Sequence, residues 1–206
     1  MGTRGRPPLQ SDETILEAAL TAFAASGYSA TSVRALNAEL ELSHETITKR
    51  FGSKTELYKA AVNYGLLAFV AEFDREIAVC EPINDLERLR SIVRAFMIAA
   101  SHHPTLGELL HHEGIGTAER DVLMTEIGLG ELMLDVANLM RRLNDDGVIQ
   151  EMPLRDLWFL IQGSAAPLHF HGLTEMFDPI DGPIDRDRYI ERMTDAIMRS
   201  MRIDSE

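Results

Sequence analysis

The chain has 206 residues, a net charge of −13 and a single cysteine, Cys80, which excludes an intrachain disulfide. It contains no apolar run of the roughly 18 residues that a membrane helix needs, so we expect no membrane partner. Residues 1–8 are basic and lack the apolar segment of a secretory signal, which favours a cytoplasmic protein.

The acidic charge is distributed unevenly along the chain. Residues 1–65 carry seven Lys/Arg and seven Asp/Glu, which leaves 13 of the 20 basic and 26 of the 33 acidic residues in 66–206. All three lysines, Lys49, Lys54 and Lys59, lie in the first part. An acidic body does not exclude a nucleic-acid partner if a local basic surface faces the phosphates.

The N-terminal part is predicted to be a flexible basic arm, residues 1–10, followed by a helix. Ser11 is a good N-cap, and Asp12 and Glu13 suit the first turn of the helix. Gly27 is predicted to end this helix.

Residues 32–51 are predicted to form two short helices joined by a tight turn. Their inward faces carry Val33, Leu36 and Leu40, and then Ile47 and Phe51. Ser43 is placed as the N-cap of the second helix. A short helix, a turn and a capped helix with a polar outer face suit insertion into the major groove of DNA.

The remainder of the chain is also predicted to be helical. Ser53 and Glu56 form a capping box that opens a long helix ending before Pro82. Apolar repeats predict further helices over about 86–100, 105–113, 119–145, 153–173 and 186–202. Pro167 is expected to kink the helix that contains it, and residues 178–185 to form a loop. No strand alternation is present, so the prediction is an all-α fold of about nine helices.

Residues 15–62, ILEAALTAFAASGYSATSVRALNAELELSHETITKRFGSKTELYKAAV, resemble the tetracycline-repressor (TetR) family of bacterial regulators. The resemblance lies in "F…GY..TSV", the serine before the recognition helix, and "F.SK.EL". It implies a three-helix helix-turn-helix DNA-binding domain in residues 11–62 and a helical effector-binding and dimerisation domain in residues 63–206. The chain departs from the family where alanine, glycine, a small residue and an aromatic residue are common, at Asn37, Glu41, Glu45 and Thr48.

The predicted base-contacting residues lie in the N-terminal part of the second short helix, which faces base edges in this binding mode. They are His44, Glu45, Thr46, Thr48 and Lys49. Glu45 either accepts from cytosine N4 or pairs with Lys49 four residues later.

The predicted phosphate contacts lie outside that helix. Thr31 and Ser32 place hydroxyls beside the free N–H groups of the first short helix, where ordinary capping is the alternative role. The resemblance implies a phosphate contact for Lys54, whose alternative is a solvated side chain. Arg4 and Arg6 suit a narrow, A·T-rich minor groove, with a disordered tail as the alternative.

Recognition of a palindrome requires two copies of one recognition helix, so we expect a homodimer on double-stranded operator DNA. The predicted interface is the last two helices, about 153–173 and 186–202. Small residues at 163–166 would permit close approach. Apolar surface would come from Met193, Ile197, Met198 and Met201, unless these side chains pack inside the subunit.

The resemblance further implies that a small apolar or amphipathic effector binds among the central helices and releases a repressor from its operator. Core packing is the alternative role for every candidate lining residue. The candidates are Phe96, Met97, His103, Leu106, Leu110, Met124, Ile127, Met133, Trp158, Gln162, His169 and Phe170.

The sequence does not support an enzyme and predicts no cofactor or metal. It contains no G-x-S-x-G elbow and no glycine-rich phosphate loop, and Cys80 has no evident base partner. Two alternatives remain: an all-helical adaptor and a metal-binding helical protein, neither of which would bind DNA. The candidate metal ligands are His102, His103, His111, His112, His169 and His171.

Overall fold

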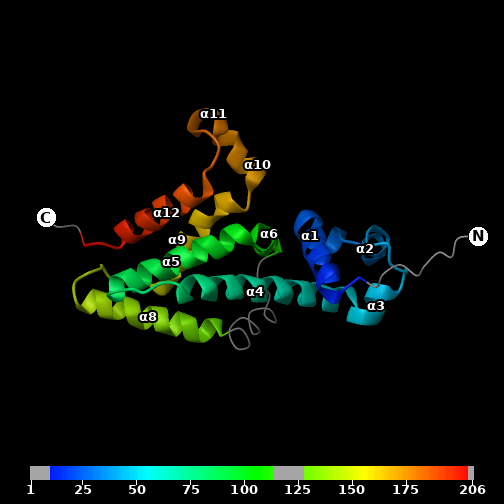
Figure 1. The fold of residues 1–206 in the computed structure, drawn as a ribbon, viewed down its shortest axis with the longest axis horizontal. Coiled ribbons are helices and arrows are strands. Elements are labelled where there is room, and N and C mark those ends of the chain that lie inside the picture. Colours follow the sequence, from blue (N-terminus) through cyan, green and yellow to red (C-terminus); the bar gives the residue numbers. More distant parts are fainter. Residues whose placement is uncertain (1–9, 114–127, 204–206) are drawn as a thin grey trace, which may run out of the picture.

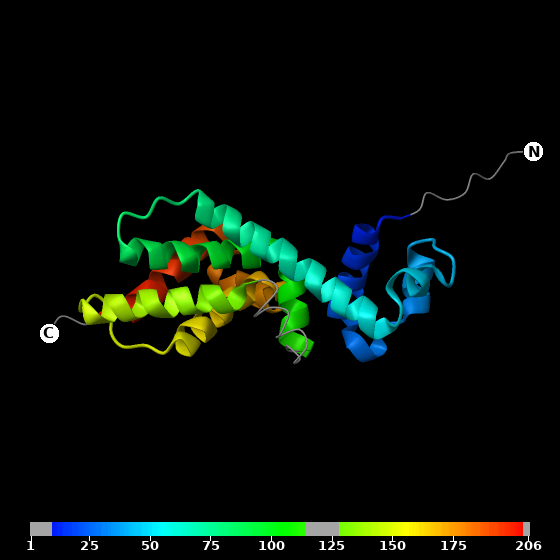
Figure 2. The ribbon, with the colours of Figure 1, turned by 90° about the horizontal axis from the view of Figure 1, so that it is seen from below.

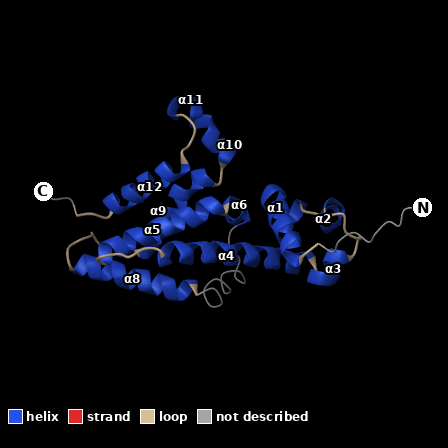
Figure 3. Ribbon diagram, in the orientation of Figure 1, coloured by secondary structure: helices blue, strands red, loops and turns tan. Residues whose placement is uncertain are grey.

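The computed structural model describes residues 10–113 and 128–203. Within these ranges the regular elements are helices, apart from one isolated bridge between Ile149 and Arg202 (Figure 3). The predicted all-α fold is therefore confirmed. In the same ranges, no helix is both long enough and apolar enough to cross a bilayer.

Three helices form one end of an elongated molecule (Figure 1): α1 (Asp12–Ala30), α2 (Val33–Glu39) and α3 (Thr46–Phe51). The Ser11 side chain accepts the Thr14 N–H at 3.1 Å, as expected of an N-cap. Gly27 has a φ of 74° and interrupts α1, but the chain returns to helical geometry as far as Ala30. The glycine, which has no Cβ to clash, therefore breaks the helix where its end was predicted, and a short helical piece follows as far as Ala30.

Helix α4 (Lys54–Ala78) runs from this end into the body of the molecule (Figure 2). Ser53 accepts the Glu56 N–H at 3.2 Å, and its hydroxyl donates to the Glu56 carboxylate, so Ser53 caps α4 as predicted. Leu57 and Val62 belong to the core around α1, whereas Phe73 belongs to a core shared with α5. One continuous helix thus crosses the predicted domain boundary at residue 62.

The body contains α5 (Asp85–His102), α6 (Pro104–Glu113), α8 (Leu129–Asp145), α9 (Leu154–Ala165) and α12 (Arg186–Ser200). Pro104 and Pro153 stand at the starts of α6 and α9, where the missing N–H has no helical partner to lose. The apolar stripes of α5, α8, α9 and α12 face each other in one large core.

Two predictions for residues 153–185 are wrong in detail. Helix α9 ends at Ala165 and is not merely kinked, because Pro167 removes a hydrogen-bond donor and the chain tightens into the 3₁₀ turn η2 (Ala166–Leu168). The expected loop begins with helix α11 (Asp178–Asp181). Together with α10 (His171–Thr174) and η3 (Glu175–Phe177), it forms a projection beside α12 (Figure 1). We call residues 171–181 the lateral segment.

Helix α6 joins the two halves of the molecule. Its Leu106 and Leu109 are buried in the core around α1 and α4. On another side, a Cβ on Gly107 would lie 2.4 Å from the His169 ring, so only glycine fits this approach of α6 to the segment after α9.

Candidate DNA interface

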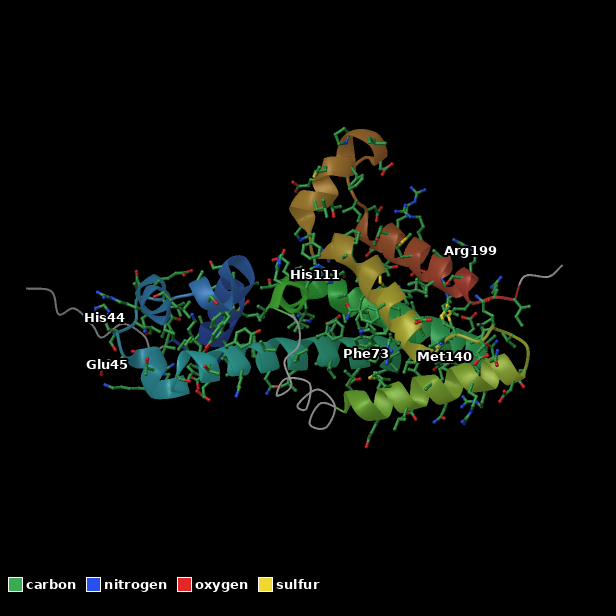
Figure 4. All side chains as sticks on the ribbon, turned by 180° about the vertical axis from the view of Figure 1, so that it is seen from behind. His44, Glu45, Phe73, His111, Met140 and Arg199 are labelled. Carbon is green, nitrogen blue, oxygen red and sulfur yellow. The ribbon has the colours of Figure 1, made fainter. Side chains whose placement is uncertain are left out.

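Helices α2 and α3 each bury one apolar side and leave the other exposed. Leu36 and Ile47 are only 2% and 1% exposed and pack in the core formed with α1 and α4. Thr48 and Lys49 lie on the exposed side of α3. His44 and Glu45 are exposed in the turn before it, at the opposite end of the molecule from Arg199 (Figure 4). This end therefore exposes polar side chains on α3 and on the turn before it, while the opposite side of α3 packs on the core.

The predicted role of Ser43 as N-cap of the second short helix is wrong. Helix α3 begins at Thr46, and its N-cap residue, Glu45, makes no side-chain capping bond. The Ser43 hydroxyl instead hydrogen-bonds the Thr46 hydroxyl at 2.7 Å.

Asn37 on α2 supplies the missing bond to α3. Its side chain is fully buried, and Oδ1 accepts the Ile47 N–H at 3.3 Å. Nδ2 donates to the carbonyl oxygens of Val33 and His44, at 3.1 and 3.2 Å. The signal for this role in the sequence was the departure from the family's usual alanine at this position.

The C-terminus of α2 has the hydrogen-bond pattern of a Schellman motif. Leu42 N–H donates to the Asn37 carbonyl at 2.8 Å, and Glu41 N–H donates to the Ala38 carbonyl at 3.1 Å. Glu41 occupies the left-handed position with a φ of 55°. Glycine is the residue that usually suits this position.

Glu45 and Lys49 form an exposed ion pair of 2.7 Å along α3. The hydrogen bond and charge of Lys49 hold the pKa of the Glu45 carboxyl below its usual range. The intrahelical pair considered for Glu45 is thus present in the DNA-free chain. Contact with cytosine requires this pair to open and stays a prediction.

The predicted phosphate contacts have different surroundings. Ser32 is exposed and caps α2 by accepting the Ala35 N–H at 3.3 Å. Thr31 is buried, and its hydroxyl lies within hydrogen-bond distance of the carbonyls of Gly27 and Ala22, at 2.8 and 3.1 Å. The Thr31 proton is therefore already used inside the domain. Arg4 and Arg6 lie outside the described residues.

Lys54 is held against the end of α1. Its Nζ donates to the Ser29 carbonyl at 3.2 Å and lies 4.7 Å from the centre of the Tyr28 ring. This position keeps the ammonium group near the N-termini of α2 and α4, where N–H groups can also bind phosphate.

Two arginines in this region were not among the predicted contacts. Arg34 is exposed in the first turn of α2. Arg50 donates to the Gln10 carbonyl at 2.6 Å and to Asp12 Oδ1 at 3.2 Å, which ties the start of α1 to α3. Because Arg50 follows Lys49 directly, helical rotation turns it away from the exposed side.

The predicted ligand residues that the structure describes lie in several parts of the body of the molecule. Phe96 contacts Phe69 and Trp158 with ring centres 5.2 and 5.6 Å apart, and Phe69 lies 6.3 Å from the His103 ring. These aromatic side chains connect α4, α5 and α9. Of the other candidates, Met97 is fully buried in the large core, Leu106 and Leu110 pack in the α1 core, and Met133 and Gln162 are partly exposed. Met124 and Ile127 lie outside the described residues.

His169 and Phe170 lie beside the histidines of α6. The Phe170 ring centre is 4.8 Å from that of His111. Burial, with a smaller contribution from the charges of His171 and His111, lowers the pKa of His169 to about 4. Burial also lowers the pKa of His103. Among the described residues, no group of three or more His, Cys, Asp or Glu side chains is arranged to hold a metal ion.

The apolar surface predicted for dimerisation is largely inside the subunit. Ile197, Met198 and Met201 are buried in the large core, so that part of the prediction is wrong. Amphipathic spacing shows that these side chains are covered, but the covering elements here are helices of the same chain.

Other apolar side chains are exposed nearby. They lie on α9 and on the lateral segment and are Phe159, Leu160, Leu173, Met176, Phe177 and Ile180. A cavity of about 710 Å³ separates the lateral segment from α12 and is lined in part by Phe170, Phe177 and Tyr189 and by the arginines Arg188 and Arg192.

The profile for bacterial regulatory proteins of the tetR family matches residues 15–61. No curated protein matches the chain.

Several solved structures have a similar fold over nearly the whole chain. The TetR family transcriptional regulator PfmR from Thermus thermophilus is 25% identical, with a TM-score of 0.60, and covers 90% of this chain and 97% of its own. AibR in complex with isovaleryl coenzyme A and operator DNA is 18% identical, with a TM-score of 0.68 and coverages of 89% and 95%. The ketosteroid transcriptional regulator KstR2 of Mycobacterium tuberculosis is 17% identical, with a TM-score of 0.68 and coverages of 95% and 97%.

Proposed function

We propose that this chain, whose residues 15–61 match the profile of the tetR family of bacterial regulatory proteins, represses transcription by binding a palindromic operator until a small molecule releases it. The N-terminal helices, within residues 11–62, contact the DNA. Residues 63–206 bind the effector and form the homodimer. The family assignment supports a regulator and not an enzyme.

The main observation in favour of DNA binding is the set of exposed polar side chains on α3 and on the turn before it. His44, Glu45, Thr48 and Lys49 are exposed at the free end of the molecule, while Leu36 and Ile47 hold the unit from behind. A supported helix with an outward polar face is what the major groove accommodates. Ser32, Lys54 and Arg34 border the exposed polar side chains and supply hydroxyl and cationic groups for phosphates.

Selection of bound sequences from a random duplex library tests this function. We expect enrichment of a palindrome whose half-sites are about one helical turn or more apart, with affinity that falls steeply as salt increases. Enrichment of no sequence, or binding that does not depend on salt, would exclude the proposed operator and favour the adaptor alternative.

The proposed homodimer is supported by the apolar side chains exposed on α9 and on the lateral segment. Met176 and Ile180 are 70% and 83% exposed, and Phe159 on α9 is 66% exposed. Large apolar side chains that stay exposed in one part of a fold are a common mark of interaction surfaces. A twofold axis across this face would bury them against their counterparts, as an isologous interface requires.

The proposed effector is an apolar or amphipathic molecule that contacts the aromatic side chains between α4, α5 and α9. Phe96 and Trp158 are the central candidates, and AibR shows that a protein of this fold holds isovaleryl coenzyme A together with operator DNA. Release requires the effector to favour a non-binding arrangement by roughly 1–3 kcal/mol. Quenching of Trp158, the only tryptophan in the chain, provides a ligand screen.

A further inference from the structure

One buried residue of α2, Asn37, makes side-chain hydrogen bonds both to the turn and to the start of α3. The Asn37 backbone carbonyl accepts Leu42 N–H at 2.8 Å as α2 ends. Its Nδ2 binds the His44 carbonyl at 3.2 Å, and its Oδ1 binds the Ile47 N–H at 3.3 Å. The end of one helix, the turn and the start of the next are therefore all hydrogen-bonded to one residue, which is 0% exposed.

These bonds determine more than stability, because they are directional. Helix α3 has only six residues and is held on its inner side by apolar contacts such as Ile47. Apolar contacts are non-directional and allow a short helix to roll or slide by a fraction of an ångström. Hydrogen bonds from a buried amide restrict such motion, because their strength falls steeply as the angle departs from linear.

The local sequence makes this restraint more important in this chain. Glu41 occupies a left-handed position that favours glycine, and the N-cap residue Glu45 makes no capping bond. Two features that commonly define such a turn are thus absent, and Asn37 replaces the small residue typical of the family at the same junction.

We propose that Asn37 is a positioning residue for sequence recognition: its amide sets the orientation of α3, and thereby the placement of His44, Thr48 and Lys49 against base edges. This role rests on the proposed function, because it requires that α3 contact DNA. It predicts that loss of the amide reduces discrimination between sequences more than it reduces attraction to DNA in general.

The test compares wild-type protein with Asn37→Ala on two duplexes of equal length, the palindrome selected by the wild type and a random sequence. We expect the ratio of the two affinities to fall about tenfold, the order of one well-placed base contact. Affinity for random DNA and its dependence on salt should be unchanged, because the exposed cations remain. Amide exchange of Ile47 should become faster in the variant.

A matched control separates positioning from folding. Val62→Ala removes a buried side chain from the same core without touching the turn, so it should lower the thermal midpoint and leave the affinity ratio unchanged. Asn37→Ala combined with Glu41→Gly should recover part of the discrimination, because glycine relaxes the left-handed position.

The outcomes distinguish the two proposals. If the wild type selects no sequence, the proposed function is wrong, and the positioning role of Asn37 is wrong as well. If the wild type discriminates and Asn37→Ala discriminates equally well, or if Val62→Ala loses discrimination to the same extent, only the positioning role of Asn37 is overturned.

Discussion

Glu41 is the one residue other than glycine with a positive φ among residues 10–113 and 128–203. Its N–H and that of Leu42 donate the two Schellman bonds that end α2, so the conformation is imposed by the turn and not by the side chain. A side chain in this region costs about 1–2 kcal/mol through the contact of its Cβ with the backbone. Glycine at this position would avoid the steric cost. It would also make the unfolded chain more flexible, which lowers the free energy of unfolding.

We expect Glu41→Gly to raise the free energy of unfolding by about 0.5–1 kcal/mol, as strain is relieved and part of the gain is lost to unfolded-state entropy. Urea unfolding followed by circular dichroism measures it. Glu39→Gly, in the helical last turn of α2, should instead destabilise by about 1 kcal/mol. A lower midpoint for Glu41→Gly would show that its carboxylate makes a compensating contact.

Lys49 is exposed and forms an ion pair with Glu45. To contribute to DNA binding, it must leave Glu45 and contact the DNA instead. If Lys49 contacts a base, Lys49→Ala is expected to cost about 1–3 kcal/mol on the selected palindrome and much less on random DNA. Fluorescence anisotropy with both duplexes measures this difference. Lys59→Ala removes the same charge from α4 as a control, and an equal loss on both duplexes would identify Lys49 as a phosphate contact.

His169 is expected to make stability depend on pH. Its pKa is about 4 in the folded chain against 6.5 for an ordinary histidine, so the unfolded chain binds the proton first as pH falls. The stabilisation is therefore complete above about pH 6.5 and is lost progressively towards about pH 4, by up to about 3 kcal/mol.

Urea unfolding between pH 7 and pH 4 tests this expectation. His169→Gln should flatten the pH dependence of the unfolding free energy, even if the variant is less stable at pH 7. His112→Gln, at an exposed position, should leave the dependence unchanged. Parallel curves for the wild type and His169→Gln would show that His169 does not titrate in this range.

At the scale of elements, α6 and α4 carry the contacts between the two halves of the chain. Helix α4 contributes to the core around α1 and to the core shared with α5, and Phe69 packs against both and against the large core as well. Helix α6 buries leucines in the α1 core while Gly107 touches His169. A displacement near η2 therefore has a direct steric route to the core that supports the DNA-contacting helices.

Gly107→Ala is expected to destabilise the protein by about 1–3 kcal/mol, because its methyl group would overlap the buried His169 ring and force one element to move. Thermal unfolding measures the change. Gly172→Ala is the matched control, since nothing lies within 4 Å of its added Cβ and helix propensity should make it neutral or stabilising. Similar effects for both variants would contradict the steric explanation.

At the scale of the whole molecule, charge is distributed unevenly between the two ends. Residues 1–65 have no net charge, and residues 66–206 carry the whole excess of acid. This distribution repels DNA from the body and favours approach by the α2–α3 end. Six of the large exposed apolar side chains in the described residues lie outside that end, on α9 and the lateral segment.

We expect the double variant Phe159→Glu with Ile180→Glu to dissociate the proposed dimer, because it places charges in a surface that must become dry. Sedimentation velocity should show a monomer, and affinity for the palindrome should fall at least tenfold while a single half-site binds as before. Ile83→Glu introduces a charge at an equally exposed apolar residue after α4 and serves as the control. A dimer that persists in the double variant would place the interface elsewhere.

The helices and their order followed from the sequence because their signals are local. Ser11 and Ser53 act within three residues, Pro104 and Pro153 act on their own turns, and the spacing of apolar residues defines each buried stripe. The α2–turn–α3 unit was predicted in the same way, and so was the placement of Thr48 and Lys49 on an outward face.

The tertiary structure decided which element covers each stripe and which side chains bond across the fold. Asn37 acts over ten residues to Ile47, and the Thr31 hydroxyl reaches the Ala22 carbonyl, so neither partner is visible in a local pattern. Amphipathic spacing marked Ile197 and Met201 as buried without showing that the same subunit buries them. The helical spacing of apolar residues shows that one face of a helix is buried. Which element buries that face depends on how distant segments of the chain pack.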